Sequence, residues 1–412
     1  MSFSIGSFNY RALVEKIQTP FYVYDSEKII SQYQTLLKAL GRKIQIRFAI
    51  KANSNLSILR LIHEQGGGVE VVSGGELLRA LKAKIPTNRI VFSGIGKTEE
   101  EIRFAINTSI EQLSVESLEE LKKVKEIAEE LQKEIPICLR INPNIEAKTH
   151  VKITTGTSEN KFGIPLSQIE EASKLITKSA YLTYLGLSVH IGSQIQSVEP
   201  YQQMFRVIKE IAQNLKTKGY SFKRLDLGGG FSVPYSTDEL PFDLTAYAKA
   251  LKEELGDLDY ELVIEPGRYL VAEAGVLLTK ILYVKRTPNR TFVIIDAGMN
   301  DMMRPALYDA KHPIIACETG INSTGKELMD IVGPVCESSD CFSKQVLLPK
   351  NLQPGDILAI THTGAYGASL SSTYNSRALI PELLVDKDKL FLIRERIDPE
   401  HLLTFEIPRC LT

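Results

Sequence analysis

Short apolar, β-branched runs alternate with amphipathic segments between residues 44 and 266. Eight such runs occur: IQIRFAI, VEVVS, RIVFSG, QLSVES, PICLRINP, YLGLSVHIG, RLDLGGG and LVIEPG. Continuous apolar strands separated by helices are typical of a parallel sheet that is covered on its faces. Eight strand and helix repeats predict an α/β fold, a (β/α)8 TIM-like barrel, rather than an open doubly wound sheet.

Two of the intervening segments have clear helix starts. Residues 117–134 open with Ser117 and Glu120, and residues 98–106 open with Thr98 and Glu101. A Ser or Thr followed three residues later by Glu predicts a capping box. In the longer segment, apolar side chains recur at helical spacing, at Leu118, Leu121, Val124 and Ile127. Both segments are therefore predicted to be helices that pack one face against the barrel.

The pattern changes after residue 275. Strand-like runs separated by Pro, Gly and Asn turns follow one another: GVLLTKILYVK, RTFVIIDAG, KELMDIVGPVC, PGDILAITHTG and KLFLIRERI. They predict a C-terminal β-sandwich or β-barrel domain. The early run PFYVYD, residues 20–25, is expected to pair into that domain. We expect the barrel to comprise residues 28–275, and residues 1–27 together with residues 276–412 to form the β domain.

Composition and charge narrow the range of partners. Lys and Arg number 49 against 50 Asp and Glu, so the formal net charge is -1, and no basic stripe indicates nucleic acid or an anionic membrane. The first 20 residues do not resemble a leader, and nowhere do about 18 apolar residues run together. Five cysteines occur without a CxxC pair, so neither a metal site nor a disulfide framework is predicted. These features favour a cytoplasmic protein with a small-molecule partner.

Polar residues and glycines follow several of the predicted strands. In a (β/α)8 barrel the catalytic groups lie where strands end and loops begin. The first strand ends at Lys51, and the sixth at His190 and Ser193. The seventh and eighth are followed by two further groups of residues: Gly228, Gly229 and Gly230, then Glu265, Pro266, Gly267 and Arg268. We expect all of these residues to meet at one mouth of the barrel.

The combination indicates pyridoxal phosphate. Glycines after the seventh strand let backbone N–H groups approach a phosphate, and Arg268 adds positive charge. The cofactor's aldehyde reacts with a lysine, and its ring nitrogen needs a partner such as Glu265. Taken singly, each feature has a plainer explanation: a triple glycine is often a turn, and Lys51 alone is more often a surface charge.

Six ordered motifs between about residue 20 and residue 385 carry a family resemblance: FAIKAN, HIGSQI, LDLGGGF, EPGRY, CESSD and AYGAS followed by YNSR. They resemble the motifs of fold-type III pyridoxal-phosphate decarboxylases, and within that family those of the diaminopimelate decarboxylases. The resemblance implies a carboxy-lyase that converts meso-2,6-diaminopimelate to L-lysine and carbon dioxide. It also implies a homodimer with shared active sites, to which the β domain contributes at the dimer interface.

The resemblance also implies roles for cofactor-binding residues. Lys51 corresponds to the lysine that binds the cofactor aldehyde, and His190 to the ring that stacks on the pyridine. Glu265 corresponds to the carboxylate that keeps the pyridine nitrogen protonated. The remaining predicted cofactor-binding residues surround the phosphate or belong to the same loops, and they are Ser193, Gly228, Gly229, Gly230, Pro266, Gly267, Arg268 and Tyr374.

A second set is implied to act on the substrate. Cys336 corresponds to the residue that reprotonates the α-carbon, and in the family it reaches the active site across the dimer interface; as a bare sequence feature it is equally a small buried hydrophobe. The implied catalytic residues are thus Lys51, His190 and Cys336. Glu337 corresponds to the group that meets the distal amine. Substrate contacts are further implied for Arg268, Arg304, Tyr308 and Tyr374, of which Arg304 and Tyr308 grip the distal carboxylate.

Two features depart from the family pattern. Glu70 occupies a position where the family usually has aspartate, which affects one contact near the active site. Residues 147–163 correspond to the family's active-site lid, although the start of the segment is less typical, and the sequence by itself indicates only a polar loop.

Three alternatives remain open at this point. A fold-type III amino-acid racemase shares the barrel and the lysine, but an arginine beside the ring nitrogen would take the place of Glu265. A decarboxylase of ornithine, lysine or arginine would not need Arg304, because those substrates lack a distal carboxylate. A non-catalytic relative that keeps only the fold is expected to have lost Lys51 or Cys336.

Overall fold

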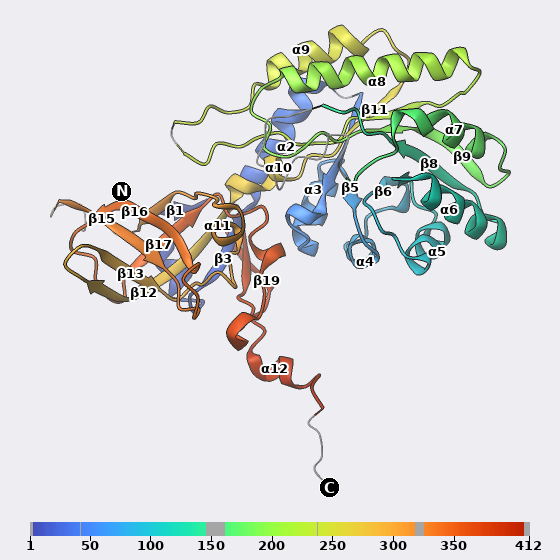
Figure 1. Cartoon of the computed structure of the whole chain (residues 1–412). Helices are drawn as coiled ribbons and strands as arrows, with labels where there is room; N and C mark the ends of the chain where they lie inside the picture. Colours follow the sequence, from blue (N-terminus) through green and yellow to red (C-terminus); the bar gives the residue numbers. More distant parts are fainter. Residues whose placement is uncertain (1–2, 42, 146–160, 237, 318–324, 408–412) are drawn as a thin grey trace. The chain divides into compact units, whose positions relative to one another are not determined.

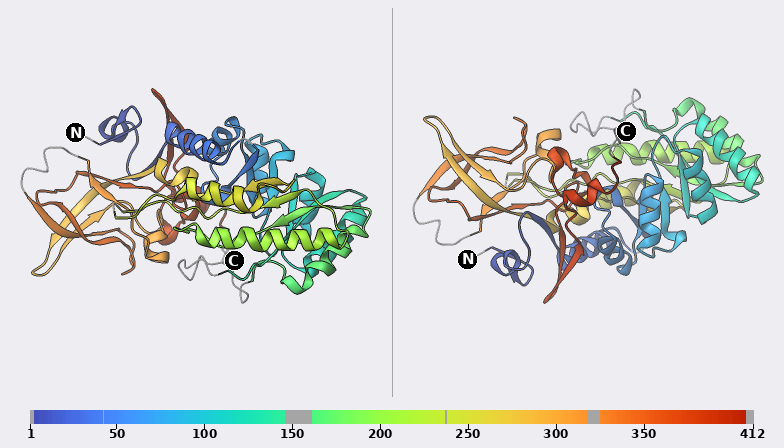
Figure 2. Two further views of the ribbon diagram at one scale, coloured as in Figure 1. Left: turned by 90° about the horizontal axis from the view of Figure 1, so that it is seen from above. Right: turned by 90° about the horizontal axis from the view of Figure 1, so that it is seen from below.

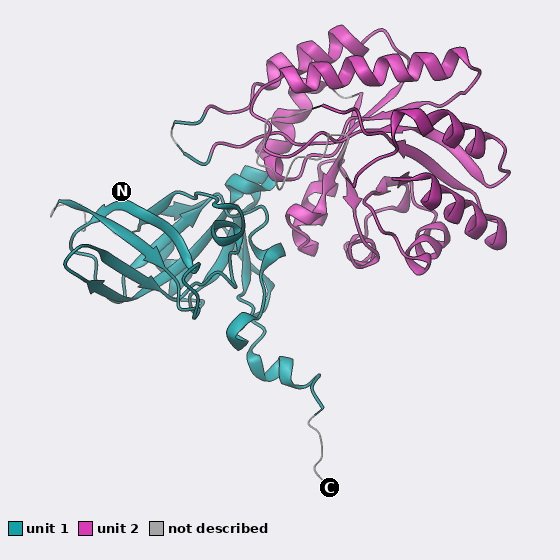
Figure 3. Ribbon diagram, viewed as in Figure 1, with its two compact units in different colours: residues 1–29, 235–239, 271–412 teal, residues 30–234, 240–270 magenta. Residues whose placement is uncertain are grey.

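The structure is a computed structural model that describes residues 3–41, 43–145, 161–236, 238–317 and 325–407. The chain divides into two compact units, coloured separately in Figure 3. Unit 1 contains residues 1–29, 235–239 and 271–412, and unit 2 contains residues 30–234 and 240–270. The chain therefore passes from unit 2 into unit 1 and back within the few residues that follow the glycine motif.

Unit 2 contains a closed barrel of eight strands, so the predicted (β/α)8 fold is confirmed (Figure 1). Every neighbouring pair is parallel, and the pairing of Ile44 with Leu262 closes the ring between its last and first strands. The strands correspond one to one with the eight apolar runs: β4 (Ile44–Ala49), β5 (Gly68–Val71), β6 (Ile90–Phe92), β7 (Gln112–Val115), β8 (Ile135–Arg140), β9 (Leu182–Ser188), β10 (Arg224–Asp226) and β11 (Glu261–Ile264).

Helices connect successive strands of the barrel, and Figure 2 shows α8 and α9 side by side in unit 2. Their apolar residues face the strands, as Leu121, Val124 and Ile127 of α6 do. The connecting helices are α3 (Leu56–Glu64), α4 (Gly74–Lys82), α5 (Glu99–Thr108), α6 (Leu118–Leu131), α7 (Ile169–Thr177), α8 (Glu199–Thr217) and α9 (Leu244–Leu255). Helix α2 (Ser26–Leu40) precedes the first barrel strand, and α10 (Arg268–Val271) follows the last. Short 3-10 turns lie at η1 (Ile50–Ala52), η2 (Thr87–Arg89), η4 (Leu166–Gln168) and η5 (Ala272–Ala274).

Of the two predicted capping boxes, one is confirmed and one is wrong in part. At the start of α5, Glu101 N donates to Thr98 Oγ1 and Thr98 N donates to the Glu101 carboxylate, which completes the box. At the start of α6, Ser117 Oγ accepts from Glu120 N as predicted. The Glu120 carboxylate, however, accepts from the backbone N–H of Glu116 rather than of Ser117. The cap therefore also fixes the end of the preceding strand.

Unit 1 contains the predicted β domain. Its main sheet has nine strands, of which seven follow the order β16-β15-β13-β12-β3-β18-β19. The other two are β17, which pairs with β12, and β14, which pairs with β17. The early run is β3 (Phe21–Asp25), which pairs with β12 and β18 as expected. The other strands are β12 (Gly275–Arg286), β13 (Thr291–Ile295), β14 (Ile314–Ala316), β15 (Lys326–Val332), β16 (Cys341–Pro349), β17 (Ile357–Thr361), β18 (Glu382–Asp386) and β19 (Lys389–Arg394).

Small elements complete unit 1. They are β1 (Ser4–Ile5), β2 (Phe8–Asn9), α1 (Tyr10–Val14), α11 (Arg304–Tyr308), η7 (Ala368–Leu370), η8 (Tyr374–Ser376) and α12 (Pro399–Leu403). The core of the unit includes Phe21, Val23, Leu278 and Ala359, all completely buried. Among the described residues, no helix is long and apolar enough to cross a membrane.

Candidate active site

Lys51 lies at the carboxyl end of the first barrel strand. It follows β4 directly, in the 3-10 turn η1. Its Nζ atom is 3.3 Å from Oε2 and 3.4 Å from Oε1 of Glu70, which belongs to the neighbouring strand β5. Glu70 is buried, whereas the Lys51 side chain is 40% exposed. The longer carboxylate at position 70 therefore contacts the lysine amine directly, and the amine remains accessible to a ligand.

His190 lies two residues beyond β9 and contacts the glycine loop. Its Nδ1 atom accepts a hydrogen bond of 3.2 Å from Gly229 N. Burial lowers the pKa of the imidazole well below its ordinary value, and the charges of Arg140 and Lys51 lower it further. His190 is therefore a neutral ring with a defined tautomer, since Nδ1 is an acceptor.

The three glycines after β10 lie where any side chain would collide with neighbouring backbone atoms. A Cβ atom on Gly228 would lie 2.4 Å from Val189 O and 2.8 Å from His190 Nδ1, and the residue has a φ of +65°. A Cβ on Gly229 would lie 2.2 Å from Glu265 O. Only glycine fits such close backbone contacts. Two N–H groups of the loop have partners within the protein, since Gly228 N donates to Asp226 Oδ1 and Gly229 N donates to His190 Nδ1. Contact of the glycine loop with a phosphate stays a prediction.

Arg268 and Ser193 are brought together although 75 residues separate them in the sequence. Arg268 Nη2 donates to Ser193 Oγ at 3.3 Å, and the arginine is 8% exposed. Pro266 and Gly267 precede this arginine, and Pro266 O accepts from Ala49 N at the end of β4. The loops after the first, sixth and eighth strands therefore meet, with a cation among them.

Glu265 forms a buried acidic pair with Asp226, the last residue of β10. The two carboxyl groups interact, and burial disfavours the ionised form of each. Burial raises the pKa of Glu265 well above its ordinary value, and the charges of Asp226 and Glu70 raise it further. Asp226 also accepts from Gln112 Nε2 at 2.9 Å and from Gly228 N at 3.2 Å.

These groups fit pyridoxal phosphate. Glu265 Oε1 is buried and has no hydrogen-bond partner among the residues that the structure describes. A buried acceptor without a partner is costly, so it is suited to a ligand that brings a donor, such as a protonated ring nitrogen. Lys51 offers an amine, Ser193 offers a hydroxyl group, and Arg268 offers positive charge. The predicted residues Lys51, His190, Ser193, Gly228, Gly229, Gly230, Glu265, Pro266, Gly267 and Arg268 thus all lie at one end of the barrel.

A second cluster of predicted residues lies within unit 1. Tyr374 Oη donates to Glu337 Oε1 at 2.6 Å, and this contact raises the pKa of the phenol. Cys336 is exposed, and its backbone N–H donates to Asn375 Oδ1 at 2.9 Å. The loop is held on its other side by Asp340, whose carboxylate accepts from Val335 N at 2.6 Å. The thiol is thus presented at the surface of the unit by a fixed backbone rather than packed in its core.

Arg304 and Tyr308 form the two ends of the short helix α11 in unit 1. Arg304 is 6% exposed, and its Nη1 atom is 2.7 Å from His312 Nε2. The guanidinium carbon also lies 4.7 Å from the centre of the Tyr235 ring. Tyr308 is half-buried one turn further along α11. Both residues predicted to bind the distal carboxylate therefore project from one helical turn.

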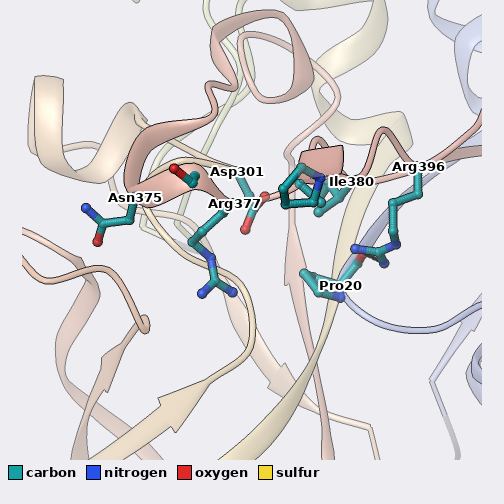
Figure 4. A pocket seen from close by; sticks show the side chains of 9 residues that line it. Pro20, Asp301, Asn375, Arg377, Ile380 and Arg396 are labelled. Atoms are coloured by element: carbon teal, nitrogen blue, oxygen red, sulfur yellow. Dashed lines mark hydrogen bonds between the residues drawn. The ribbon is translucent and has the colours of Figure 1, made fainter. Parts of the chain in front are cut away.

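A pocket of about 340 Å³ lies beside the cluster that contains Cys336 and Tyr374 (Figure 4). Asp301 and Arg377 lie next to each other in it, and burial raises the pKa of Asp301 to about 7. Asn375, which holds the Cys336 loop, is one of its lining residues: Pro20, Asp301, Asn375, Ser376, Arg377, Ala378, Ile380, Arg396 and Pro399. None of the residues predicted from the sequence to bind cofactor or substrate lines this pocket, so it is separate from the predicted contacts.

Some residues of the site were missed by sequence reasoning. Asp226, His312 and Asn375 contact predicted residues directly. A polar residue inside a buried strand gives a signal for Asp226, and the quoted motif YNSR contains Asn375, but nothing in the local pattern distinguishes His312. Of the predicted lid, residues 147–160 lie outside the described residues.

Comparison with known proteins agrees with this geometry. Residues 26–272 match the family described as "Pyridoxal-dependent decarboxylase, pyridoxal binding domain". The chain is 45% identical over 404 residues to diaminopimelate decarboxylase of Helicobacter pylori strain J99, covering 97% of this chain and 98% of that protein.

Solved structures give the same result. The crystal structure of diaminopimelate decarboxylase from Helicobacter pylori complexed with L-lysine has a TM-score of 0.92 and 45% identity, over 96% of this chain and 98% of that one. The crystal structure of diaminopimelate decarboxylase from M. jannaschii in co-complex with L-lysine has a TM-score of 0.93 and 39% identity. The match covers 99% of this chain and 96% of that one.

Proposed function

This chain belongs to the pyridoxal-dependent decarboxylases, among the diaminopimelate decarboxylases, and from that premise we propose that it converts meso-2,6-diaminopimelate to L-lysine and carbon dioxide. The observation that carries the proposal is the meeting of Lys51, His190, Glu265 and a glycine loop at one mouth of the barrel. A decarboxylase of ornithine or another basic amino acid is not favoured, since the similarity to diaminopimelate decarboxylases extends over almost the whole chain.

Pyridoxal phosphate supplies, when bound, an aldehyde that reacts with amines and a ring that accepts the electron pair released with carbon dioxide. Lys51 would hold the aldehyde end, and Glu70 beside it provides a carboxylate that can take or return the proton of the amine. His190 would pack against the ring as a neutral imidazole. Ser193, Gly230, Gly267 and Arg268 would surround the phosphate.

Glu265 would contact the ring nitrogen. Its Oε1 atom is buried and has no partner among the described residues, so a protonated ring nitrogen would supply the hydrogen-bond donor that it lacks. A protonated ring is the better electron acceptor, which favours loss of carbon dioxide. An arginine at this position would favour racemisation instead, so Glu265 speaks against the racemase alternative.

The substrate's distal end is bound by residues of the β domain in this proposal. Arg304 and Tyr308 take the distal carboxylate, Glu337 takes the distal amine, and Tyr374 and Arg268 are the other proposed substrate contacts. Cys336 donates the proton that replaces the carboxyl group, and its exposed position supports this role. We further propose a cytoplasmic homodimer in which Cys336 of one subunit serves the site of the other.

Absorbance tests the cofactor part of the proposal. The purified protein with added pyridoxal phosphate should show a visible band that borohydride abolishes, and peptide mapping should locate the reduced cofactor on Lys51. Cofactor trapped on another lysine would contradict the assignment of Lys51 alone.

Substitution of Arg304 tests the substrate part. Arg304→Ala should lower kcat/KM for meso-diaminopimelate by about 10²-fold to 10⁴-fold, because a charge-assisted, two-pronged contact to the distal carboxylate is lost. Arg206→Ala removes an exposed arginine from α8 and should leave kcat/KM unchanged. An unchanged kcat/KM in Arg304→Ala would remove the role assigned to Arg304 while leaving the cofactor site intact.

A further inference from the structure

The Arg304 guanidinium is held in unit 1 by two aromatic rings that are distant in the sequence. His312 follows α11, and Tyr235 belongs to the short segment Tyr235–Glu239, which counts with unit 1. The two ring centres lie 4.9 Å apart with an interplanar angle of 70°. The imidazole ring therefore meets the guanidinium at Nη1, and the guanidinium carbon lies over the Tyr235 ring.

Hydrogen-bond chemistry determines the tautomer of His312. Its Nδ1 atom is 3.0 Å from Thr361 O, and a carbonyl oxygen only accepts, so Nδ1 carries the hydrogen. An arginine only donates, so His312 Nε2 must accept from Arg304 Nη1. Both contacts can be satisfied only by a neutral imidazole, and the 5% exposure of His312 keeps water from replacing either of them.

Neither of the two rings carries a negative charge. An imidazole lone pair and an aromatic face therefore orient the cation without themselves cancelling its charge. The plane of the guanidinium is thereby set before any ligand arrives, which reduces the entropy lost on binding.

We propose that His312 and Tyr235 are positioning residues that fix Arg304 for recognition of the carboxylate at the distal end of the substrate. This inference rests on the proposed function, because it takes Arg304 as the carboxylate-binding residue. It goes further in assigning selectivity to the pair of rings: they favour a ligand with a distal carboxylate over one that has only an amine there.

Two product-like ligands separate orientation from general damage. When carbon dioxide leaves one end of meso-diaminopimelate, the carboxylate at the other end remains, so L-lysine retains the group that Arg304 would bind. 1,5-Diaminopentane has the same chain and amines but no carboxylate. Binding of each ligand to the holoenzyme can be measured by calorimetry for the wild type, Arg304→Ala, His312→Ala and His312→Gln.

The expected result is selective. His312→Ala should weaken L-lysine binding by about tenfold, the scale of one hydrogen bond to a charged group, and should leave 1,5-diaminopentane binding unchanged. His312→Gln, whose amide oxygen can accept from Arg304, should recover most of the loss. Tyr235→Leu should behave like His312→Ala, whereas Tyr235→Phe keeps the ring face and should bind like the wild type.

Three outcomes decide the matter. An unchanged L-lysine affinity in His312→Ala, with a large loss in Arg304→Ala, would overturn the positioning role and leave the proposed function intact. Equal losses for both ligands would show that His312 only supports the fold. If L-lysine binding is unchanged in Arg304→Ala, the substrate contact itself fails, and the positioning role fails with it. If His312→Ala does not fold, the two Tyr235 variants provide the same comparison.

Discussion

The barrel mouth and the β-domain cluster hold their functional side chains in different ways. At the mouth, Lys51, His190 and Glu265 each follow a strand within two residues, so the backbone of the barrel sets their positions. In the β domain, Cys336 lies in a loop and Tyr374 in the short turn η8, and they are held by contacts such as Cys336 N to Asn375 Oδ1. The residues proposed to bind the cofactor thus mostly follow regular strands, whereas those proposed to act on the substrate lie mostly in loops and short helical turns.

The largest effect is expected from Lys51 at the mouth. Lys51→Ala should fold, show no borohydride-trapped cofactor and lose turnover by on the order of 10³-fold or more, because the amine that holds the cofactor is gone. Lys249→Ala, at an exposed position of α9, is the matched control and should behave as the wild type. Substantial turnover in Lys51→Ala would mean that the barrel mouth does not depend on this residue.

The glycine loop tests whether backbone geometry at the mouth matters as much. Gly228→Ala places a Cβ atom against Val189 O at a φ of +65°. Strain of this kind costs about 1–3 kcal/mol, so the cofactor should bind about tenfold to a hundredfold more weakly in a titration of the apoenzyme. Gly75→Ala, whose Cβ would meet only Ser73 Oγ at 3.8 Å, should not change the affinity. Equal affinities for the two variants would argue against a tight cradle.

Asn375 tests the β-domain side of the comparison. Asn375→Ala removes the acceptor for Cys336 N, so the thiol loop loses one anchor, and kcat should fall by roughly tenfold. Cofactor affinity should stay constant, because the variant leaves Lys51, His190 and Arg268 of the barrel mouth unchanged. Asn375→Asp keeps the acceptor and should retain most of the turnover. A loss of cofactor affinity together with the loss of kcat would contradict the separate roles of the two regions.

The smallest effect concerns Glu76, near Lys51 in unit 2. Burial raises the pKa of Glu76 to about 7, while Val72 N donates to its carboxylate at 2.8 Å. A carboxyl with a raised pKa in the folded state gives stability that is complete below about pH 4.5 and is lost as the pH rises through about 7. Glu76→Gln keeps the hydrogen bond and should remove about 1–2 kcal/mol of this pH dependence, after allowance for partial exposure. Thermal unfolding of the wild-type and Glu76→Gln holoenzymes at pH 5 and pH 8 measures this pH dependence. An equal change in unfolding free energy between the two pH values in both proteins would contradict the raised pKa.

The sequence predicts the two regions unequally, for a physical reason. All eight barrel strands and the residues that end them follow from apolar period and chain order, because parallel strands bring their carboxyl ends to one side. Local patterning gives neither the pairing of Asp226 with Glu265 nor the contact of Arg304 with His312, since each needs the packed fold. Two smaller cases show the same limit. Strand β16 matches none of the strand-like runs predicted after residue 275, and the Glu120 carboxylate accepts from Glu116 N instead of the predicted Ser117 N.

The most direct test of the account is carbon dioxide release by the holoenzyme from meso-diaminopimelate, L-lysine and L-ornithine at equal concentration. The account predicts rapid release from meso-diaminopimelate with L-lysine as the product, and little from the other two, which leave Arg304 without a distal carboxylate. Release from L-ornithine or L-lysine at a rate equal to or above that from meso-diaminopimelate would contradict it.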